Sequence, residues 1–131
     1  MQKKRPARIE DTNIERHSVL PSPKEIKGEY PLTERARQVT LSARQQIQRA
    51  LDRTLQRHIL VVGPCSVHDV DGARAYAERL IKLASAVSDY VMVIMRVYVE
   101  KPRTALGWKG LIYDPDLDGS CDIERGLRLA R

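Results

Sequence analysis

The spacing of apolar residues predicts two helices in the first half of the chain. Ser22-Pro23-Lys24-Glu25 has the pattern of a capping box and begins a short helix that ends near Gly28. Thr33 caps a longer helix, predicted to run to about Arg57 with one buried face. The apolar residues of that face recur every three or four positions: Ala36, Val39, Ala43, Ile47, Ala50, Leu51 and Leu55.

From residue 58 the pattern changes to short, continuously apolar runs. The runs at residues 58–63 and 90–98 predict strands buried on both faces, as in parallel sheets. Asp69 or Asp71 begins a predicted helix between them, over residues 70–87. Its apolar stripe comprises Ala73, Tyr76, Ala77, Leu80, Ile81 and Ala84. Strand, helix and strand in succession predict a βαβ unit with a parallel sheet.

The remaining segments are an arm, a loop and the beginning of a helix. Residues 1–21 are polar and without periodicity, and residues 99–121 are rich in Gly, Pro and Asp. Residues 123–131 have a helical pattern without a C-cap signal. Because two parallel strands cannot cover both faces of their sheet, we expect the sequence to stop inside a larger α/β fold.

Composition and charge narrow the class of protein. The 131 residues are 42% hydrophobic and 31% charged, as in soluble globular proteins. The net charge of +6 arises in residues 1–60, which hold 13 Lys and Arg against 7 Asp and Glu. A basic arm is either solvated or contacts nucleic acid. The chain has no Phe and one Trp, so an RNA-binding sheet is disfavoured and no nucleic-acid partner is expected.

Targeting signals are not evident. The apolar runs are far shorter than the roughly 18 residues of a membrane helix, and the basic N-terminus leads into no apolar segment. We therefore expect a cytoplasmic protein without membrane contact, in which Cys65 and Cys121 are reduced thiols.

Candidate chemistry lies where the two predicted strands end, because parallel strands bring these ends to one edge of the sheet. Cys65 follows the first strand, and the cations Arg96, Lys101 and Arg103 follow the second. Arg and Lys grouped in this way suit an anionic substrate, and Thr104 adds a hydroxyl donor. The alternative is a solvated loop whose cations pair with a carboxylate.

Cys65 has several interpretations on the residues alone. It is a small buried residue, a nucleophile or a metal ligand. His68, three residues later, is a second candidate ligand, but no further Cys, His or carboxylate has a supporting spacing.

Four motifs together resemble a known family, the type I metal-dependent 3-deoxy-D-arabino-heptulosonate 7-phosphate (DAHP) synthases. The motifs are Gly63-Pro64-Cys65-Ser66-Val67-His68-Asp69, Met95-Arg96-Val97-Tyr98-Val99-Glu100-Lys101-Pro102-Arg103-Thr104, Gly107-Trp108-Lys109-Gly110-Leu111-Ile112 and Asp114-Pro115-Asp116-Leu117-Asp118-Gly119-Ser120. The resemblance is strong over residues 58–131 and is weaker, in layout only, over residues 22–57. These transferases condense phosphoenolpyruvate with erythrose 4-phosphate in the first step of the shikimate pathway to aromatic amino acids.

The resemblance implies a fold of α/β class, an incomplete (β/α)₈ TIM barrel. Residues 1–57 would be the N-terminal arm and helical extension, and residues 58–131 the truncated first part of the barrel, which needs about 250 residues in full. The full-length enzyme is expected to be a homo-oligomer. The alternative function is a catalytically dead truncated product that binds or modulates a full-length synthase.

The resemblance also implies roles for individual residues. Cys65 matches the family's cysteine ligand to a divalent metal, which would be Mn, Fe, Co or Zn. Arg96 and Lys101 match residues that hold phosphoenolpyruvate, and Lys101 is also the expected catalytic residue. Arg103 and Thr104 match the motif that binds the phosphate of the aldose. The family's other metal ligands, a His, a Glu and an Asp, belong to later strands, and His68 is not among them.

One position departs from the family's pattern. Val99 stands where the family usually has Phe. Because Val99 alternates away from Arg96, we expect the change to affect packing. Cys65 is then the one family metal ligand in the chain, so we expect the 131 residues alone to be inactive.

Overall fold

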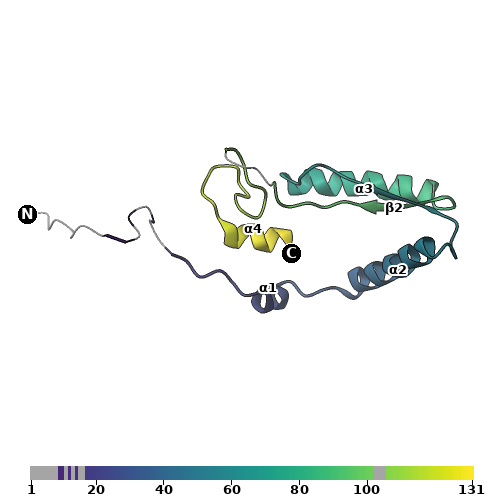
Figure 1. Ribbon diagram of the computed structural model, residues 1–131, viewed down its shortest axis with the longest axis horizontal. Helices are drawn as coiled ribbons and strands as arrows, with labels where there is room; N and C mark the ends of the chain where they lie inside the picture. Colours follow the sequence, from purple (N-terminus) through teal and green to yellow (C-terminus); the bar gives the residue numbers. More distant parts are fainter. Residues whose placement is uncertain (1–8, 11, 13, 15–16, 102–105) are drawn as a thin grey trace, which may run out of the picture.

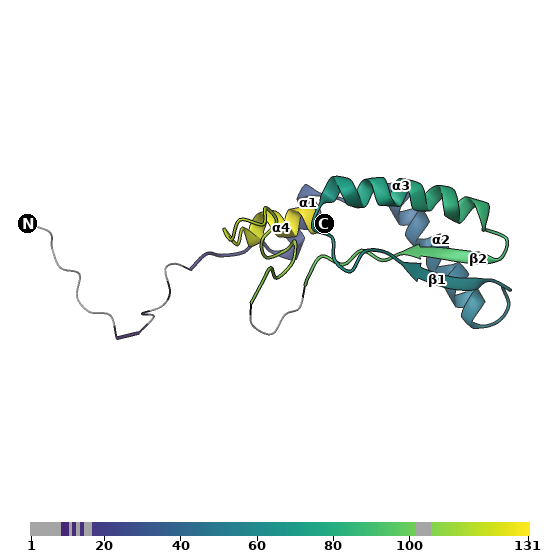
Figure 2. The same cartoon turned by 90° about the horizontal axis from the view of Figure 1, so that it is seen from above.

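The computed structural model of the chain describes residues 9, 10, 12, 14, 17–101 and 106–131. Their elements are α1 (Pro23–Glu29), α2 (Glu34–Leu51), β1 (His58–Val62), α3 (Val70–Ala86), β2 (Val91–Met95) and α4 (Ile123–Ala130). The molecule is elongated, with α1 and α4 side by side toward one end and the strands with α2 toward the other (Figures 1 and 2). No helix in the described ranges is long and apolar enough to span a membrane.

The predicted βαβ unit is confirmed. β1 and β2 pair in parallel, in a register that runs from His58 opposite Val91 to Val62 opposite Met95. The connecting helix α3 lies alongside β2 (Figure 2). It begins at Asp69, whose carboxylate accepts hydrogen bonds from two backbone N–H groups of the first turn.

The helix caps also agree with the sequence. Ser22 Oγ accepts from the N–H of Glu25 at 3.3 Å, and the Glu25 carboxylate accepts from the N–H of Ser22 at 2.6 Å. This capping box begins α1, and its backbone hydrogen bond lowers the pKa of Glu25. Thr33 Oγ1 accepts from the N–H of Ala36 and begins α2.

The end of α2 differs from the prediction. The helix was expected to continue to about Arg57, but it ends at Leu51. Arg53 adopts a left-handed backbone conformation with φ of 59°. The N–H groups of Thr54 and Leu55 both turn back to the carbonyl of Arg49. The backbone therefore leaves the helix before Leu55 can join its apolar face.

Burial of the sheet and of α2 also differs from the prediction. No residue of α2 is buried, and Val39 is 63% exposed. The strand residues Leu60 and Val61 are 45% and 60% exposed, so the cover that their apolar runs predict is missing among the described residues. The expectation that two parallel strands leave both faces of their sheet partly open is confirmed. The reason is the small size of the described sheet, because two strands offer little surface to a helix and little cover to one another.

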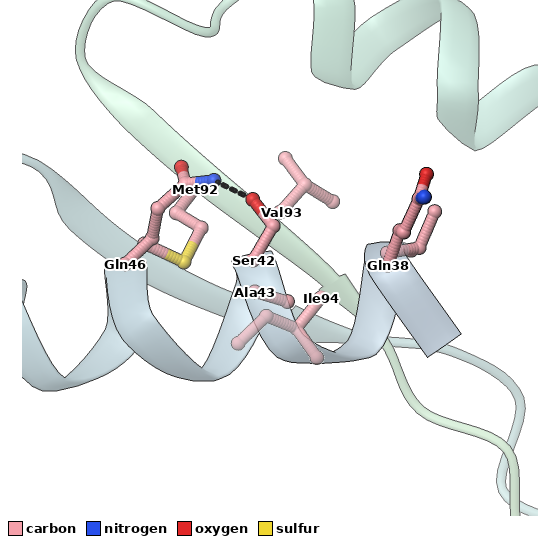
Figure 3. A pocket seen from close by; sticks show the side chains of 8 residues that line it. Gln38, Ser42, Ala43, Gln46, Met92, Val93 and Ile94 are labelled. Atoms are coloured by element: carbon pink, nitrogen blue, oxygen red, sulfur yellow. Dashed lines mark hydrogen bonds between the residues drawn. The ribbon is translucent and has the colours of Figure 1, made fainter. Parts of the chain in front are cut away.

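A groove separates α2 from β2. Its volume is about 470 Å³, and one wall is a polar stripe of α2 in which Gln46 donates a hydrogen bond to Ser42 (Figure 3). Ala43 of α2 and the β2 residues Met92 to Ile94 give the groove an apolar lining. Contact between α2 and the sheet is therefore loose.

The packed part of the described chain lies elsewhere. The buried apolar side chains are those of Ile26, Val67 and Leu111, which are 7%, 5% and 2% exposed. Val67 and Leu111 belong to the segments that follow the two strands. We call these segments, residues 63–67, 96–101 and 106–112, the strand-end region.

Candidate active site

A backbone bulge begins the strand-end region. The N–H of Arg96 donates to the carbonyl of Val62 at 2.8 Å, and the N–H of Val67 donates to the carbonyl of Tyr98 at 2.7 Å. Between these bonds the first segment advances five residues (62 to 67) and the second advances two (96 to 98). Continuing the register of β1 and β2 would put the N–H of Ser66, not that of Val67, opposite the Tyr98 carbonyl. Residues 63–66 therefore contain one extra residue, a bulge of the kind that re-aims side chains beside active sites.

Gly63 and Pro64 make the bulge sterically possible. A Cβ atom at Gly63 would collide with the backbone carbonyl of Arg96, so only glycine permits this close approach. Pro64 has no N–H, and it therefore leaves no donor unsatisfied where the regular pairing is interrupted. The Gly-Pro pair thus brings Cys65 out of the sheet.

Arg96 fills the interior of the bulge. Its Nη1 donates to the carbonyls of Pro64 and Cys65, each at 2.8 Å. The guanidinium carbon lies 4.6 Å from the centroid of the Tyr98 ring, a cation–π distance. This contact puts the Arg96 and Tyr98 side chains on the same side of their segment. The regular strand, expected to continue to Tyr98, ends at Met95 because its partner β1 gives way to the bulge.

Lys101 meets Cys65 at the edge of the sheet. Its Nζ donates to Cys65 Sγ at 3.1 Å. The thiol is exposed and the Lys101 side chain is half-buried. Cys65, Arg96 and Lys101 were expected to lie at one edge, and this expectation is confirmed. Arg103 and Thr104, the expected phosphate-binding residues, lie outside the described residues.

The loop of residues 106–112 supports Lys101 from the other side. The N–H of Lys101 donates to the carbonyl of Lys109 at 2.8 Å. Gly110 has φ of +117°, and a Cβ there would lie 2.5 Å from the Cα of Glu100. Glycine is therefore required for both its conformation and its closeness to the chain beside Lys101. The repeated glycine of Gly107-Trp108-Lys109-Gly110 was visible in the sequence, but the sequence did not show what Gly110 does.

The acidic segment after this loop is structural. The Asp114 carboxylate accepts from the N–H of Gly119, and the Asp116 carboxylate pairs with Arg125 at 3.2 Å. Hydrogen bonds from Ser120 lower the pKa of Asp118. Among the residues that the structure describes, no group of three or more His, Cys, Asp or Glu side chains could hold a metal ion. Cys65 and His68 therefore do not make a metal site with the described residues around them.

A second polar connection joins the helices α1 and α4. Arg128 of α4 pairs with Glu29 of α1 at 2.7 Å and with Glu124 at 2.8 Å. The hydrogen bond from Arg128 lowers the pKa of Glu29. Gly126, two residues before Arg128, lies so close to the backbone of Ile112 that a Cβ atom would collide with it, so α4 also contacts the strand-end region.

Known proteins with similar sequences share one activity name. The chain is 40% identical over 124 residues to the phenylalanine-inhibited phospho-2-dehydro-3-deoxyheptonate aldolase of Saccharomyces cerevisiae, covering 95% of this chain and 34% of the relative. It is 42% identical over 123 residues to the Tyr-sensitive enzyme of that name from Escherichia coli, covering 94% of this chain and 35% of the relative. The chain thus spans about a third of the length of these relatives.

The fold is similar to a solved structure from the same group. The phospho-2-dehydro-3-deoxyheptonate aldolase of Francisella tularensis SCHU S4 superposes with a TM-score of 0.85 at 41% identity, over 91% of this chain and 35% of that one. The sequence model of the DAHP synthetase I family matches residues 35–130. That match covers well over half of the chain, which therefore belongs to the DAHP synthetase I family.

Proposed function

We propose that the chain supplies the phosphoenolpyruvate-binding part of a DAHP synthase, within an enzyme that condenses phosphoenolpyruvate with erythrose 4-phosphate. The observation that supports this proposal is the contact between Lys101 Nζ and Cys65 Sγ, beside the guanidinium of Arg96. Family membership supports it independently. Residues 58–131 would be the first part of a (β/α)₈ barrel, and residues 1–57 an extension of it.

The cations would bind the carboxylate and phosphate of phosphoenolpyruvate. Both hydrogens of Arg96 Nη1 are directed at carbonyls of the bulge, so Nε and Nη2 would face the anion. Lys101, held at its backbone by Lys109, would place a second positive charge on the same anion and serve as the catalytic cation. Arg103 and Thr104 would hold the phosphate of the aldose.

Cys65 would contribute one ligand to a divalent metal. A catalytic metal needs about three protein ligands, and the described residues around Cys65 do not supply them. Cys65 would therefore belong to a larger ligand set. A metal bound there would polarise the aldehyde carbonyl of the aldose.

A chimera tests the proposed function. This chain would replace the matching third of the Tyr-sensitive E. coli relative, and the condensation would be assayed with both substrates and Mn²⁺. We expect product from the chimera and none from the 131 residues alone, because Cys65 is the one expected ligand in this chain. A chimera that melts cooperatively and binds phosphoenolpyruvate but forms no product would contradict the proposal.

The exposed sheet supports a second candidate, a subunit that binds and modulates a full-length synthase. Leu60 and Val61 offer apolar surface to a partner. The purified chain would be added to the same relative, and association and activity would be measured. Binding that changes the activity would favour this candidate, and its absence up to high concentration would exclude it.

A further inference from the structure

Ser66 is a buried polar residue among those that the structure describes. Neither the family resemblance nor the proposed function gives it a role. The residue is 9% exposed, although it neighbours the exposed thiol of Cys65. A hydroxyl is buried at low cost only when it is hydrogen-bonded. Its partners therefore indicate what the residue holds in place.

The Ser66 hydroxyl joins the two segments of the strand-end region. Oγ donates toward the carbonyl of Glu100 at 3.0 Å and toward that of Tyr98 at 3.4 Å. Ser66 directly follows Cys65, and Glu100 directly precedes Lys101. The shorter bond therefore connects the immediate neighbours of the two side chains that meet at Sγ and Nζ.

The backbone alone does not fix this separation. The N–H of Val67 donates to the carbonyl of Tyr98, three residues before Lys101. On the other side, the Lys101 N–H is held by Lys109, which belongs to a different loop. The hydroxyl bond, by contrast, acts directly beside both Cys65 and Lys101.

We infer that Ser66 is a positioning residue, which sets the distance between the metal-binding thiol and the cation that binds phosphoenolpyruvate. The inference rests on the proposed function for the meaning of that distance. Its geometric premise, the hydrogen bond from the Ser66 hydroxyl to the Glu100 carbonyl beside the Lys101–Cys65 contact, stands on the structure alone. The residue acts through its neighbours and touches no substrate itself.

Cross-linking of the 131-residue chain measures the distance without any activity. A short thiol–amine reagent would join Cys65 to Lys101, and peptide mass spectrometry would give the yield relative to cross-links from Cys121. Ser66→Ala is expected to lower that relative yield about fivefold, the effect of losing one buried hydrogen bond. Ser66→Thr, which keeps the hydroxyl, is expected to restore most of it.

Two controls separate positioning from general damage. Ser85→Ala makes the same chemical change at an exposed position of α3 and should leave the yield unchanged. Helix content from circular dichroism and the Cys121 cross-links should be equal in all variants. An unchanged Cys65–Lys101 yield in Ser66→Ala would overturn the inference, as would a yield in Ser66→Thr as low as in Ser66→Ala.

The same variants in the chimera separate the inference from the proposed function. If Ser66 positions the pair, Ser66→Ala should lower kcat more than it raises KM for erythrose 4-phosphate. A chimera without activity would count against the proposed function and leave the cross-linking result intact. An active chimera whose kcat is indifferent to Ser66→Ala would count against the inference.

Discussion

The strand-end region and the sheet differ in how each is held together. In the strand-end region, Val67 and Leu111 are almost fully buried, and polar side chains bond to backbone carbonyls across the gap between segments. In the sheet, Val61 is 60% exposed and α2 lies across an open groove. Buried apolar side chains thus occur in loops, which are commonly the loosest part of a domain, although Val97 and Leu106 of the same region are 61% and 89% exposed.

This difference indicates which part of the molecule is held in place by residues of this chain. The contacts of Cys65, Arg96 and Lys101 all come from segments that this chain contains. The sheet is different, because its exposed apolar side chains need cover that the described residues do not supply. The described residues therefore combine a mutually bonded cluster, Cys65, Arg96 and Lys101, with an incompletely covered sheet.

The largest expected effect concerns the two thiols, that of Cys65 in the strand-end region and that of Cys121 just before α4. In the chimera, Cys65→Ser should lower activity by about 100-fold or more, because losing a metal ligand costs at least as much as losing one of its supporting partners. Cys121→Ser should change it less than about twofold, since Cys121 matches no ligand. Steady-state rates with saturating Mn²⁺ measure both. Equal losses in the two variants would refute the assignment of Cys65.

The next largest expected effect distinguishes the binding of phosphoenolpyruvate from the binding of erythrose 4-phosphate. Arg96→Ala in the chimera should raise KM for phosphoenolpyruvate about 10- to 100-fold, the effect of losing charge-assisted hydrogen bonds. KM for erythrose 4-phosphate should move far less. Arg103→Ala should show the reverse pattern, because we expect it to hold the phosphate of the aldose. Parallel changes in both constants would contradict the assignment of one arginine to each substrate.

Shortening one valine in the strand-end region and one in the sheet compares how much each region contributes to the free energy of unfolding. Val67→Ala should lower the free energy of unfolding of the chain by about 1.5–3 kcal/mol, because the side chain is buried. Val61→Ala should change it by less than about 0.5 kcal/mol, because most of that side chain already faces solvent. Urea unfolding followed by circular dichroism gives both values. A Val61 effect as large as that of Val67 would mean that the sheet face is covered in solution.

The smallest expected effect is a pH dependence of the contact between α1 and α4. The hydrogen bond from Arg128 lowers the pKa of Glu29 in the folded chain. The contact should therefore be complete above the ordinary carboxyl value of about 4.5 and be lost as the pH falls through the lowered pKa. Carboxyl NMR would follow the titration. Arg128→Gln should return Glu29 to its ordinary pKa, and a normal titration in the unmodified chain would contradict the contact.

The structural features that the sequence predicted correctly are mainly those that depend on residues close together in the chain. The capping box at Ser22 and the Thr33 cap were readable because each uses residues within one helical turn. For α3 the sequence left Asp69 and Asp71 as alternatives, and the structure has Asp69 as the cap. The parallel βαβ unit followed from the lengths and periods of three successive segments. The juxtaposition of Cys65 with Lys101 followed from the rule that parallel strands end at one edge.

What the sequence did not predict depends on pairing between distant residues. The bulge exists because the Tyr98 carbonyl accepts from the N–H of Val67 rather than from that of Ser66, a one-residue shift of register that the apolar pattern does not encode. The bonds of Arg96 and Ser66 to backbone carbonyls follow from that register. The burial expected for α2 failed for a related reason, since periodicity shows which face is apolar and not how much surface covers it.

Binding of phosphoenolpyruvate to the isotope-labelled 131-residue chain tests the central claim most directly. The claim is that the strand-end region of this chain binds that anion. We predict saturable amide shifts at Cys65, Val97 and Lys101, little change in α2 and the sheet, and loss of the shifts in Arg96→Ala. Sulfate at equal ionic strength should not reproduce them. Shifts confined to the basic residues before Thr33, or reproduced in full by sulfate, would contradict the claim.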